Sequence, residues 1–274
     1  MTERIPMPDR LREAAAHPPE SPVEPRDAAT IVVVRDGDEG IEAYLMRRQT
    51  SMAFAAGMYV FPGGGLMASD IELETPWFGP GADEWGARFR CAPDLARGLV
   101  VAAVRETFEE TGILLAGADG ESVVADTSGD HMQAARDALE EGELAFADFL
   151  VDEGLVLRAD LLGAWAHWIT PDFEPRRYDT RFFVAALPAG QQVGTMSREA
   201  DHAVWAPLSR VLASVEAGEA AMMPPTIAAC RDVSAHTAGT VLDAAAGRAF
   251  PTILPQLVLV DGEPYLETYL GESS

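Results

Sequence analysis

Apolar and polar positions follow a pattern that predicts strands in the first quarter and in the middle of the chain. The β-branched run Thr30-Ile31-Val32-Val33-Val34 is typical of a buried strand. A turn rich in Asp and Gly follows at residues 36–40, so this strand and a second one at 41–48 form a predicted hairpin. Further strands are predicted at 58–61, 164–170, 180–187, 203–205 and 257–260.

The clearest helical pattern covers residues 94–111. Leu95, Leu99, Ala102 and Phe108 recur at steps of three or four residues, and Gly112 follows as a predicted C-terminal cap. Further helices are predicted at 131–141, 143–152, 207–217 and 225–246. Because strands stand on both sides of helices along the chain, we expect a layered α/β or α+β domain.

Two segments interrupt this pattern. Residues 1–28 carry six prolines and many charges, which predicts a mobile Pro-rich tail before a domain at 29–274. Residues 66–93 mix Pro, Gly, Trp and acidic residues without a period, which predicts an inserted loop or small cap.

The charge balance excludes several classes of function. The chain has 20 basic and 44 acidic residues, a net charge of −24, and every basic residue is Arg. Without Lys, Schiff-base chemistry and P-loop phosphate binding are excluded. A chain this acidic is repelled by phosphate backbones and anionic lipids, so we expect neither nucleic-acid nor membrane binding.

Cysteine usage and hydropathy point to a compartment. Cys91 and Cys230 are the only cysteines, and neither belongs to a CxxC pair, which fits a reducing cytosol. No apolar run reaches the length of about 18 residues that a spanning helix needs. We therefore expect a cytoplasmic protein.

Candidate chemistry is concentrated at the end of the predicted helix 94–111. Glu106, Glu109 and Glu110 stand at i, i+3 and i+4, so their carboxylates converge on one face, where Arg105 can pair with Glu109. Carboxylates held this close suit a hard cation such as Mg²⁺ or Mn²⁺. A solvated acidic helix face is the alternative interpretation.

A glycine-rich turn stands upstream, in the segment Phe61-Pro62-Gly63-Gly64-Gly65. Glycines let the backbone approach a phosphate chain closely, so Gly63, Gly64 and Gly65 are candidate substrate-binding residues.

Together, the segment 61–64 and Arg105-Glu106-x-x-Glu109-Glu110-x-Gly112-Ile113 resemble the signature of the Nudix hydrolases, G-x5-E-x7-R-E-U-x-E-E-x-G-U, in which U is a bulky apolar residue. Thr107 stands where an aliphatic residue is usual. Gly64 and Arg105 are 41 positions apart, about 27 more than in the family, which resembles the split signature of the peroxisomal acyl-coenzyme A diphosphatase branch. The first Glu of the signature is therefore unassigned: counting forward from Gly64 gives Asp70, and counting back from Arg105 gives Arg97.

The resemblance implies a Nudix α/β/α sandwich with a mixed sheet, an insertion inside the signature at about 66–93 and a C-terminal helical extension. It also implies metal-dependent hydrolysis of a diphosphate bond in a nucleoside diphosphate linked to a group X. Glu106, Glu109 and Glu110 would then be metal ligands, with one of them serving as base, and Arg105 would orient them. The insertion is placed to cover the site and select X.

The identity of X stays open. A second pattern of Nudix enzymes acting on coenzyme A is matched at Leu45, Arg48, Gly57 and 61–64, but Ala53 replaces its second Arg. Coenzyme A or acyl-coenzyme A is the first prediction, and ADP-ribose, NADH or a nucleotide sugar is the alternative. A Nudix-shaped binding or regulatory module without turnover is a third reading.

Residues outside the signature complete the predicted site. Glu199 is a candidate outer metal ligand or general base, with Asp201 as second choice. Arg177, Tyr178 and Arg181 could bind phosphate or stack on a base, or form a structural ion network. The expected partner is a small nucleotide-type molecule, and a homodimer is a candidate assembly.

Overall fold

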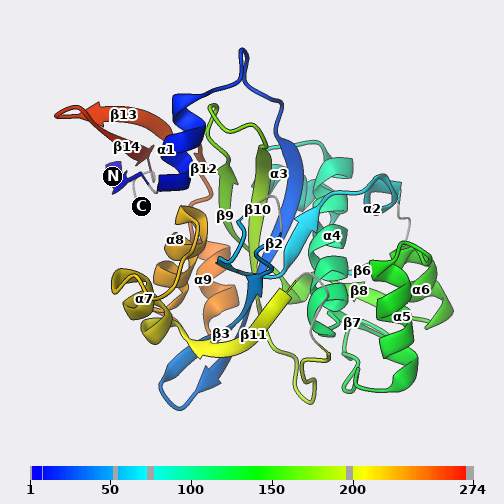
Figure 1. Ribbon diagram of the computed structural model, residues 1–274. Coiled ribbons are helices and arrows are strands. Elements are labelled where there is room, and N and C mark those ends of the chain that lie inside the picture. Colours follow the sequence, from blue (N-terminus) through cyan, green and yellow to red (C-terminus); the bar gives the residue numbers. More distant parts are fainter. Residues whose placement is uncertain (1, 8, 52–54, 73–76, 196–199, 270–274) are drawn as a thin grey trace.

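The computed structural model describes residues 2–7, 9–51, 55–72, 77–195 and 200–269 (Figure 1). The strands are β1 Thr2–Pro6, β2 Arg26–Gly37, β3 Gly40–Arg48, β4 Tyr59–Val60, β5 Gly63–Gly65, β6 Trp77–Phe78, β7 Ala116–Gly117, β8 Val156–Arg158, β9 Gly163–Ile169, β10 Tyr178–Ala186, β11 Ala200–Pro207, β12 Thr252–Ile253, β13 Gln256–Val260 and β14 Glu263–Tyr269. The helices are α1 Asp9–Ala16, α2 Ala68–Glu72, α3 Ala82–Phe89, α4 Pro93–Thr111, α5 Asp130–Glu140, α6 Phe146–Asp152, the 3₁₀ turn Ala159–Leu161, α7 Leu208–Glu216, α8 Pro224–Val233 and α9 Val241–Gly247.

The central sheet is mixed and has the strand order β11-β3-β2-β10-β9-β12, with β4 beside β3 and β5 beside β2. β2 and β3 form the predicted antiparallel hairpin, whereas β2 and β10 are parallel, with Ile31 opposite Phe183. Since β5 pairs with β2, Gly63 lies opposite Thr30 in the middle of the sheet.

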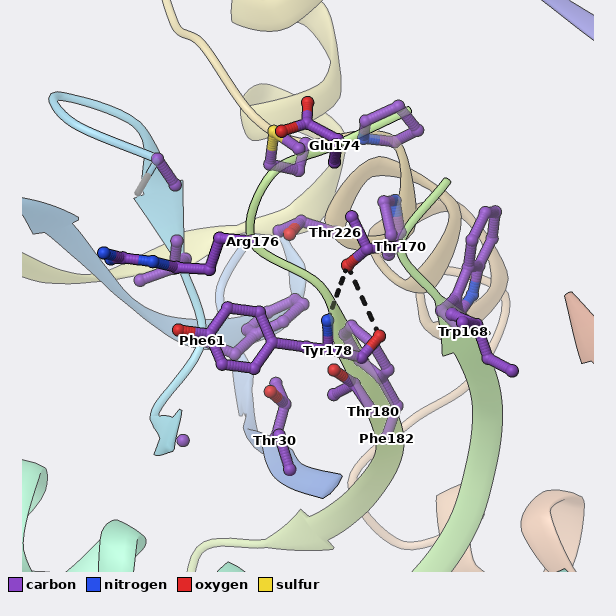
Figure 2. A pocket seen from close by; sticks show the side chains of 18 of the residues that line it. Thr30, Phe61, Trp168, Thr170, Glu174, Arg176, Tyr178, Thr180, Phe182 and Thr226 are labelled. Carbon is purple, nitrogen blue, oxygen red and sulfur yellow. Dashed lines mark hydrogen bonds between the residues drawn. The ribbon is translucent and has the colours of Figure 1, made fainter. Parts of the chain in front are cut away.

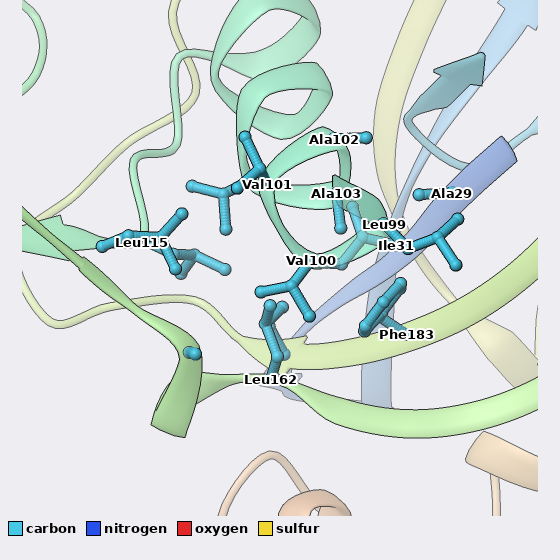
Figure 3. Close-up of a cluster of buried hydrophobic side chains, with 14 of the residues drawn as sticks. Ala29, Ile31, Leu99, Val100, Val101, Ala102, Ala103, Leu115, Leu162 and Phe183 are labelled. Carbon is cyan, nitrogen blue, oxygen red and sulfur yellow. The ribbon is translucent and has the colours of Figure 1, made fainter. Parts of the chain in front are cut away.

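Both faces of this sheet are covered, and β2 shows why. Ile31 and Val33 point into a core shared with α3 and α4, and Figure 3 shows Val100 and Leu99 of α4 packed in it. Val32 and Val34 point the opposite way, into a second core with α7, α8 and α9. Figure 1 shows the helices in these two layers on either side of the sheet. The α/β/α sandwich predicted from the sequence is confirmed.

The N-terminal segment differs from the mobile tail that its composition predicted. β1 pairs antiparallel with β14, and α1 follows it. Met7 and Leu11 are buried in a small cluster with Phe173 and Leu266. These few apolar residues are enough to hold the N-terminal segment in place because a distant part of the chain supplies β14 as a pairing strand and Leu266 as an apolar partner. Composition alone cannot reveal such a partner.

The remaining differences concern element boundaries. The strand predicted at 58–61 is shortened to β4, which pairs with β3, and the glycines predicted as a turn form a separate strand, β5, which pairs with β2. The helix predicted at 225–246 is divided into α8 and α9, and between them the backbone N–H of Thr237 donates to the hydroxyl of Thr240. Within the described part of the chain, no helix combines the length and the apolar character needed to cross a bilayer.

Candidate active site

The three predicted carboxylates lie on the last two turns of α4. Gly112 ends the helix with φ 78°, and its N–H donates to the carbonyl of Phe108. Thr107, the departure from the Nudix pattern, is fully buried, and its hydroxyl donates to the carbonyl of Ala103 at 2.6 Å. A Thr is tolerated at this apolar position because its hydroxyl finds an acceptor within its own helix.

Asp70 occupies the position that the insertion left unassigned. Its carboxylate accepts from Nε and Nη2 of Arg105 at 2.8 and 3.0 Å, and the side chains are only 1% and 3% exposed. Burial lowers the pKa of Arg105, but the hydrogen bond to Asp70 and the charges of Glu106 and Glu109 outweigh it and raise that pKa above its ordinary value. Of the two counts, the forward one from Gly64 thus reaches a residue that contacts Arg105, and α2 carries this residue.

Arg105 also holds two of the three glutamates. Its Nη1 donates to Glu106 Oε1 at 2.8 Å and contacts the Glu109 carboxylate at 3.3 Å, as the i, i+4 spacing predicted. Burial raises the pKa of both glutamates, although Arg105 acts in the opposite direction. One guanidinium thus orients carboxylates that would otherwise repel each other.

The tri-glycine strand β5 lies directly against these glutamates. The N–H of Gly63 donates to Glu110 Oε2 at 2.7 Å, and the carbonyl of Gly65 accepts from Arg105 at 3.2 Å. A Cβ on Gly64 would stand 2.3 Å from Oε1 of Glu106. The sequence explained these glycines by phosphate approach, but the contacts that require them here are with the glutamates and Arg105 of α4.

Two cavities meet at this face of α4. The first, which we call the apolar cavity, has a volume of about 420 Å³ and reaches from Gly63–Gly65 to Trp168, Met223 and Leu266. The second, the acidic cavity, has about 470 Å³ and is lined by Arg105, Glu109 and Glu140 among others. Glu106 and Glu110 line both.

The apolar cavity is lined by alternate residues of β10 and the loop before it. Figure 2 shows Arg176, Tyr178, Thr180 and Phe182 along it, with Thr170 hydrogen-bonded to the backbone of Tyr178. The predicted contribution of Tyr178 fits this geometry, and so does that of Arg48, which also lines the cavity.

Arg177 and Arg181, predicted to bind substrate, instead form structural contacts. Both are buried; Arg177 donates to the carbonyls of Thr170 and Val23, and Arg181 pairs with Asp27 and Asp179. Successive strand residues point to opposite faces, so the face that carries Tyr178 carries Arg176 and not these two. Strand alternation was the signal that could have found Arg176.

Two predicted acids lie differently. Glu199 falls outside the described residues, so its proposed role stays a prediction. Asp201 forms an ion pair with Arg47 at 2.7 Å between β11 and β3.

Arg136 of α5 was missed and supports the end of α4 that carries the three glutamates. It is 3% exposed and donates to the carbonyls of Phe108 and Glu109 at 2.9 Å each, and to that of Thr195 at 3.1 Å. A cation at this place interacts favourably with the carbonyls of the last helical turn, and it adds a second donor to the Phe108 carbonyl, which already accepts from Gly112. An Arg within a polar helix carries no local signal for such a role.

The insertion at 66–93 is also built differently from the expected cover. Trp85 and Phe89 of α3 are buried in the core against Phe183. None of its described residues lines the apolar cavity, although Met67 and Ser69 line the acidic one. The described part of the insertion therefore does not contribute to the apolar cavity, because Trp85 and Phe89 are used for packing, and its selection of X stays a prediction.

The donor set at the site has the chemistry that a hard divalent cation requires. Glu106, Glu109 and Glu110 offer carboxylate oxygens only. Their side chains are held by Arg105 and Gly63, and among the described residues no three His, Cys, Asp or Glu side chains converge closely enough to ligate one ion. Binding a cation would therefore require these carboxylates to turn toward it.

Comparisons with known proteins agree with this geometry. The family model described as the NUDT19 Nudix domain matches residues 90–232, just over half of the chain. A crystal structure of a Nudix hydrolase from Alicyclobacillus acidocaldarius is 32% identical, covers 81% of this chain and 96% of its own, and superposes with a TM-score of 0.66. The acyl-coenzyme A diphosphatase NUDT19 of Xenopus laevis is 26% identical over 197 residues, 60% of this chain and 52% of the relative. The chain thus spans about half the length of that curated relative.

Proposed function

Because the chain belongs to the NUDT19 Nudix family, we propose that it hydrolyses the diphosphate bond of coenzyme A or acyl-coenzyme A in the presence of Mg²⁺ or Mn²⁺. One water is consumed: its oxygen joins one phosphorus and the P–O–P bridge breaks. The products are adenosine 3′,5′-bisphosphate and phosphopantetheine, which keeps its acyl group when one is present.

Glu106, Glu109 and Glu110 would hold the metal, because all three line the acidic cavity and two of them, Glu106 and Glu110, also line the apolar one. When bound, a divalent cation neutralises phosphate oxygens and lowers the pKa of water. Arg105 keeps two of these carboxylates in place, and Asp70 keeps Arg105 in place. A carboxylate must accept the proton of the attacking water; we assign this role to Glu109, with Glu199 as the second candidate.

The observation that carries this proposal is the position of Glu106 and Glu110 between an acidic and an apolar cavity. A diphosphate lying there would meet metal ligands on one side and have room for its linked group on the other. Arg48 and Arg176, which line the apolar cavity, supply positive charge in a chain whose net charge of −24 repels anions elsewhere. The name of the Xenopus relative favours coenzyme A as the carrier of that group.

The test is turnover of a panel of diphosphates with Mg²⁺ or Mn²⁺. The panel holds coenzyme A, an acyl-coenzyme A, ADP-ribose, NADH and a nucleotide sugar, and products are identified by mass spectrometry. Glu109→Gln should lower kcat by about 10²-fold or more, because it loses a metal ligand and the proposed base. The matched control is Asp94→Asn at the first turn of the same helix, where Asp94 pairs with Arg97 at the surface.

Preferential turnover of the coenzyme A members supports the proposal. Preferential turnover of ADP-ribose, NADH or the nucleotide sugar would replace coenzyme A as the substrate. No metal-dependent turnover of any member, with the protein folded, would favour a binding module instead.

A further inference from the structure

One end of the apolar cavity is formed by the two terminal segments of the described chain. Leu11 of α1 and Leu266 of β14 both line it, and both belong to the small buried cluster with Met7 and Phe173. β1 and β14 are paired along five residues, which fixes α1 and β14 relative to each other. We call Leu11, Leu266 and Met223, which packs against this cluster, the terminal wall.

The terminal wall stands apart from the catalytic helix. In Figure 1, α1 and the β13–β14 hairpin lie at one end of the molecule, and α4 lies on the other side of the central sheet. The cavity is nevertheless continuous, because one set of lining residues includes Glu106 and Glu110 as well as Leu11 and Leu266. A molecule with its diphosphate at Glu106 would therefore extend toward the wall.

The lining of this extension selects the chemistry of what enters it. Beyond Tyr178, the lining residues include the apolar Trp168, Ile169 and Met223 and two prolines at the start of α8, together with the polar Thr170, Glu174 and Thr226. The polar groups can serve as hydrogen-bond partners for the amides of the pantetheine arm, which lies between the diphosphate and the acyl group, because burying those amides without partners is costly. An aliphatic chain needs none and gains from leaving water.

We propose that the apolar cavity binds the acyl chain of an acyl-coenzyme A, and that the terminal wall limits the length of chain accepted. This inference rests on the function proposed above and extends it to the class of thioester. A volume of about 420 Å³ lies within the range of sites that enclose small molecules. The N-terminal segment that composition predicted to be a mobile tail thus contributes Leu11 to the specificity element.

The test is kcat/KM along a series from coenzyme A through butyryl-, hexanoyl-, octanoyl-, decanoyl- and palmitoyl-coenzyme A, each below the concentration at which it forms micelles. Each buried methylene contributes up to about fourfold. In the wild type we expect kcat/KM to rise with chain length and then to stop rising or fall at the length that reaches the wall.

Two variants move that limit in opposite directions. Met223→Trp fills the cavity and should lower kcat/KM for the longest accepted chain at least tenfold more than it lowers kcat/KM for coenzyme A. Leu11→Ala opens the wall and should move the limit to longer chains. It keeps the proposal testable if Met223→Trp disturbs folding. Leu259→Trp is the control, because Leu259 is 71% exposed on β13 and does not line the cavity.

The outcomes separate the two proposals. Cleavage of coenzyme A with no dependence on acyl length, or with a limit that neither variant moves, overturns the acyl subsite and leaves the diphosphatase function standing. Failure to cleave coenzyme A and all its thioesters, while another diphosphate is cleaved, overturns the proposed function and the subsite with it.

Discussion

Replacing Gly64 with Ala tests whether the close approach of β5 fixes the position of the Glu106 carboxylate. The added Cβ would lie 2.3 Å from Oε1, 2.5 Å from Cδ and 2.7 Å from Oε2 of Glu106, whereas ordinary contacts begin at 3.4 Å. The carboxylate must therefore move by about 1 Å, and the 2.8 Å bond from Arg105 must lengthen or break. A misplacement of this size in a catalytic group can cost about 10²-fold in rate.

The neighbouring glycine provides a matched control. A Cβ on Gly65 would meet nothing within 4 Å, and neither glycine has a positive φ, so Ala is compatible with the backbone at both positions. Gly65→Ala should leave kcat within about twofold and can raise stability by about 0.4–1 kcal/mol by restricting the unfolded chain.

The assay is kcat and KM on the best substrate of the diphosphate panel, with urea unfolding of both variants. We expect Gly64→Ala to lose about 10²-fold in kcat while it remains folded. Equal rates for the two variants would refute the reasoning, because only one of them forces Glu106 to move.

Three further predictions concern the surroundings of the site. Asp70→Asn should destabilise the protein by about 3 kcal/mol in urea unfolding, since it breaks a buried ion pair but leaves Arg105 its bonds to two glutamates; unchanged stability would contradict that pairing. Arg176→Ala should raise KM with little loss of stability, whereas Arg177→Ala should lower stability with little change in KM, because only Arg176 lines the apolar cavity. A raised KM in Arg177→Ala would restore the prediction that Arg177 binds substrate. Burial raises the pKa of the Cys230 thiol to about 12, so the thiol of the unfolded state ionises first as the pH rises above about 9. The free energy of unfolding of the wild type should therefore fall by about 1.4 kcal/mol between pH 8 and pH 10, and that of Cys230→Ala should not. Parallel pH profiles of the two proteins in urea unfolding would exclude this cause.

The parts of the fold that could be predicted from the sequence are those that local pattern determines. β2 reads as a strand because Ile31–Val34 is buried on both faces, and α4 reads as a helix because its apolar positions keep the helical period. The sequence could not predict that residues 2–6 form strand β1, because its partner β14 lies far along the chain. Pairing over such a distance leaves no local signal.

The same division applies to the site. The spacing of Glu106, Glu109 and Glu110 on one helix places them on one face in any structure that keeps the helix. Arg181, by contrast, is buried against Asp27 because β10 lies parallel to β2, a neighbour that the local sequence does not identify. Strand alternation around Tyr178 was available and favoured Arg176, so this error was one of period rather than of missing information.

The sequence predicted that the insertion covers the site and selects X, but its described residues mainly support α4. Asp70 keeps its spacing from Gly64, so the extra residues enter after it, and α2 and α3 pack on α4 so that Asp70 still meets Arg105. Trp85 and Phe89 extend the core along α4, which makes the insertion a support for the catalytic helix. Under the proposed function, selection of the linked group would fall to the surface that lines the apolar cavity beyond Tyr178, where Leu11 and Leu266 come from distant parts of the chain. We therefore expect substitutions at Leu11 and Leu266 to change the acyl-chain length that the cavity accepts without disturbing the glutamates of α4.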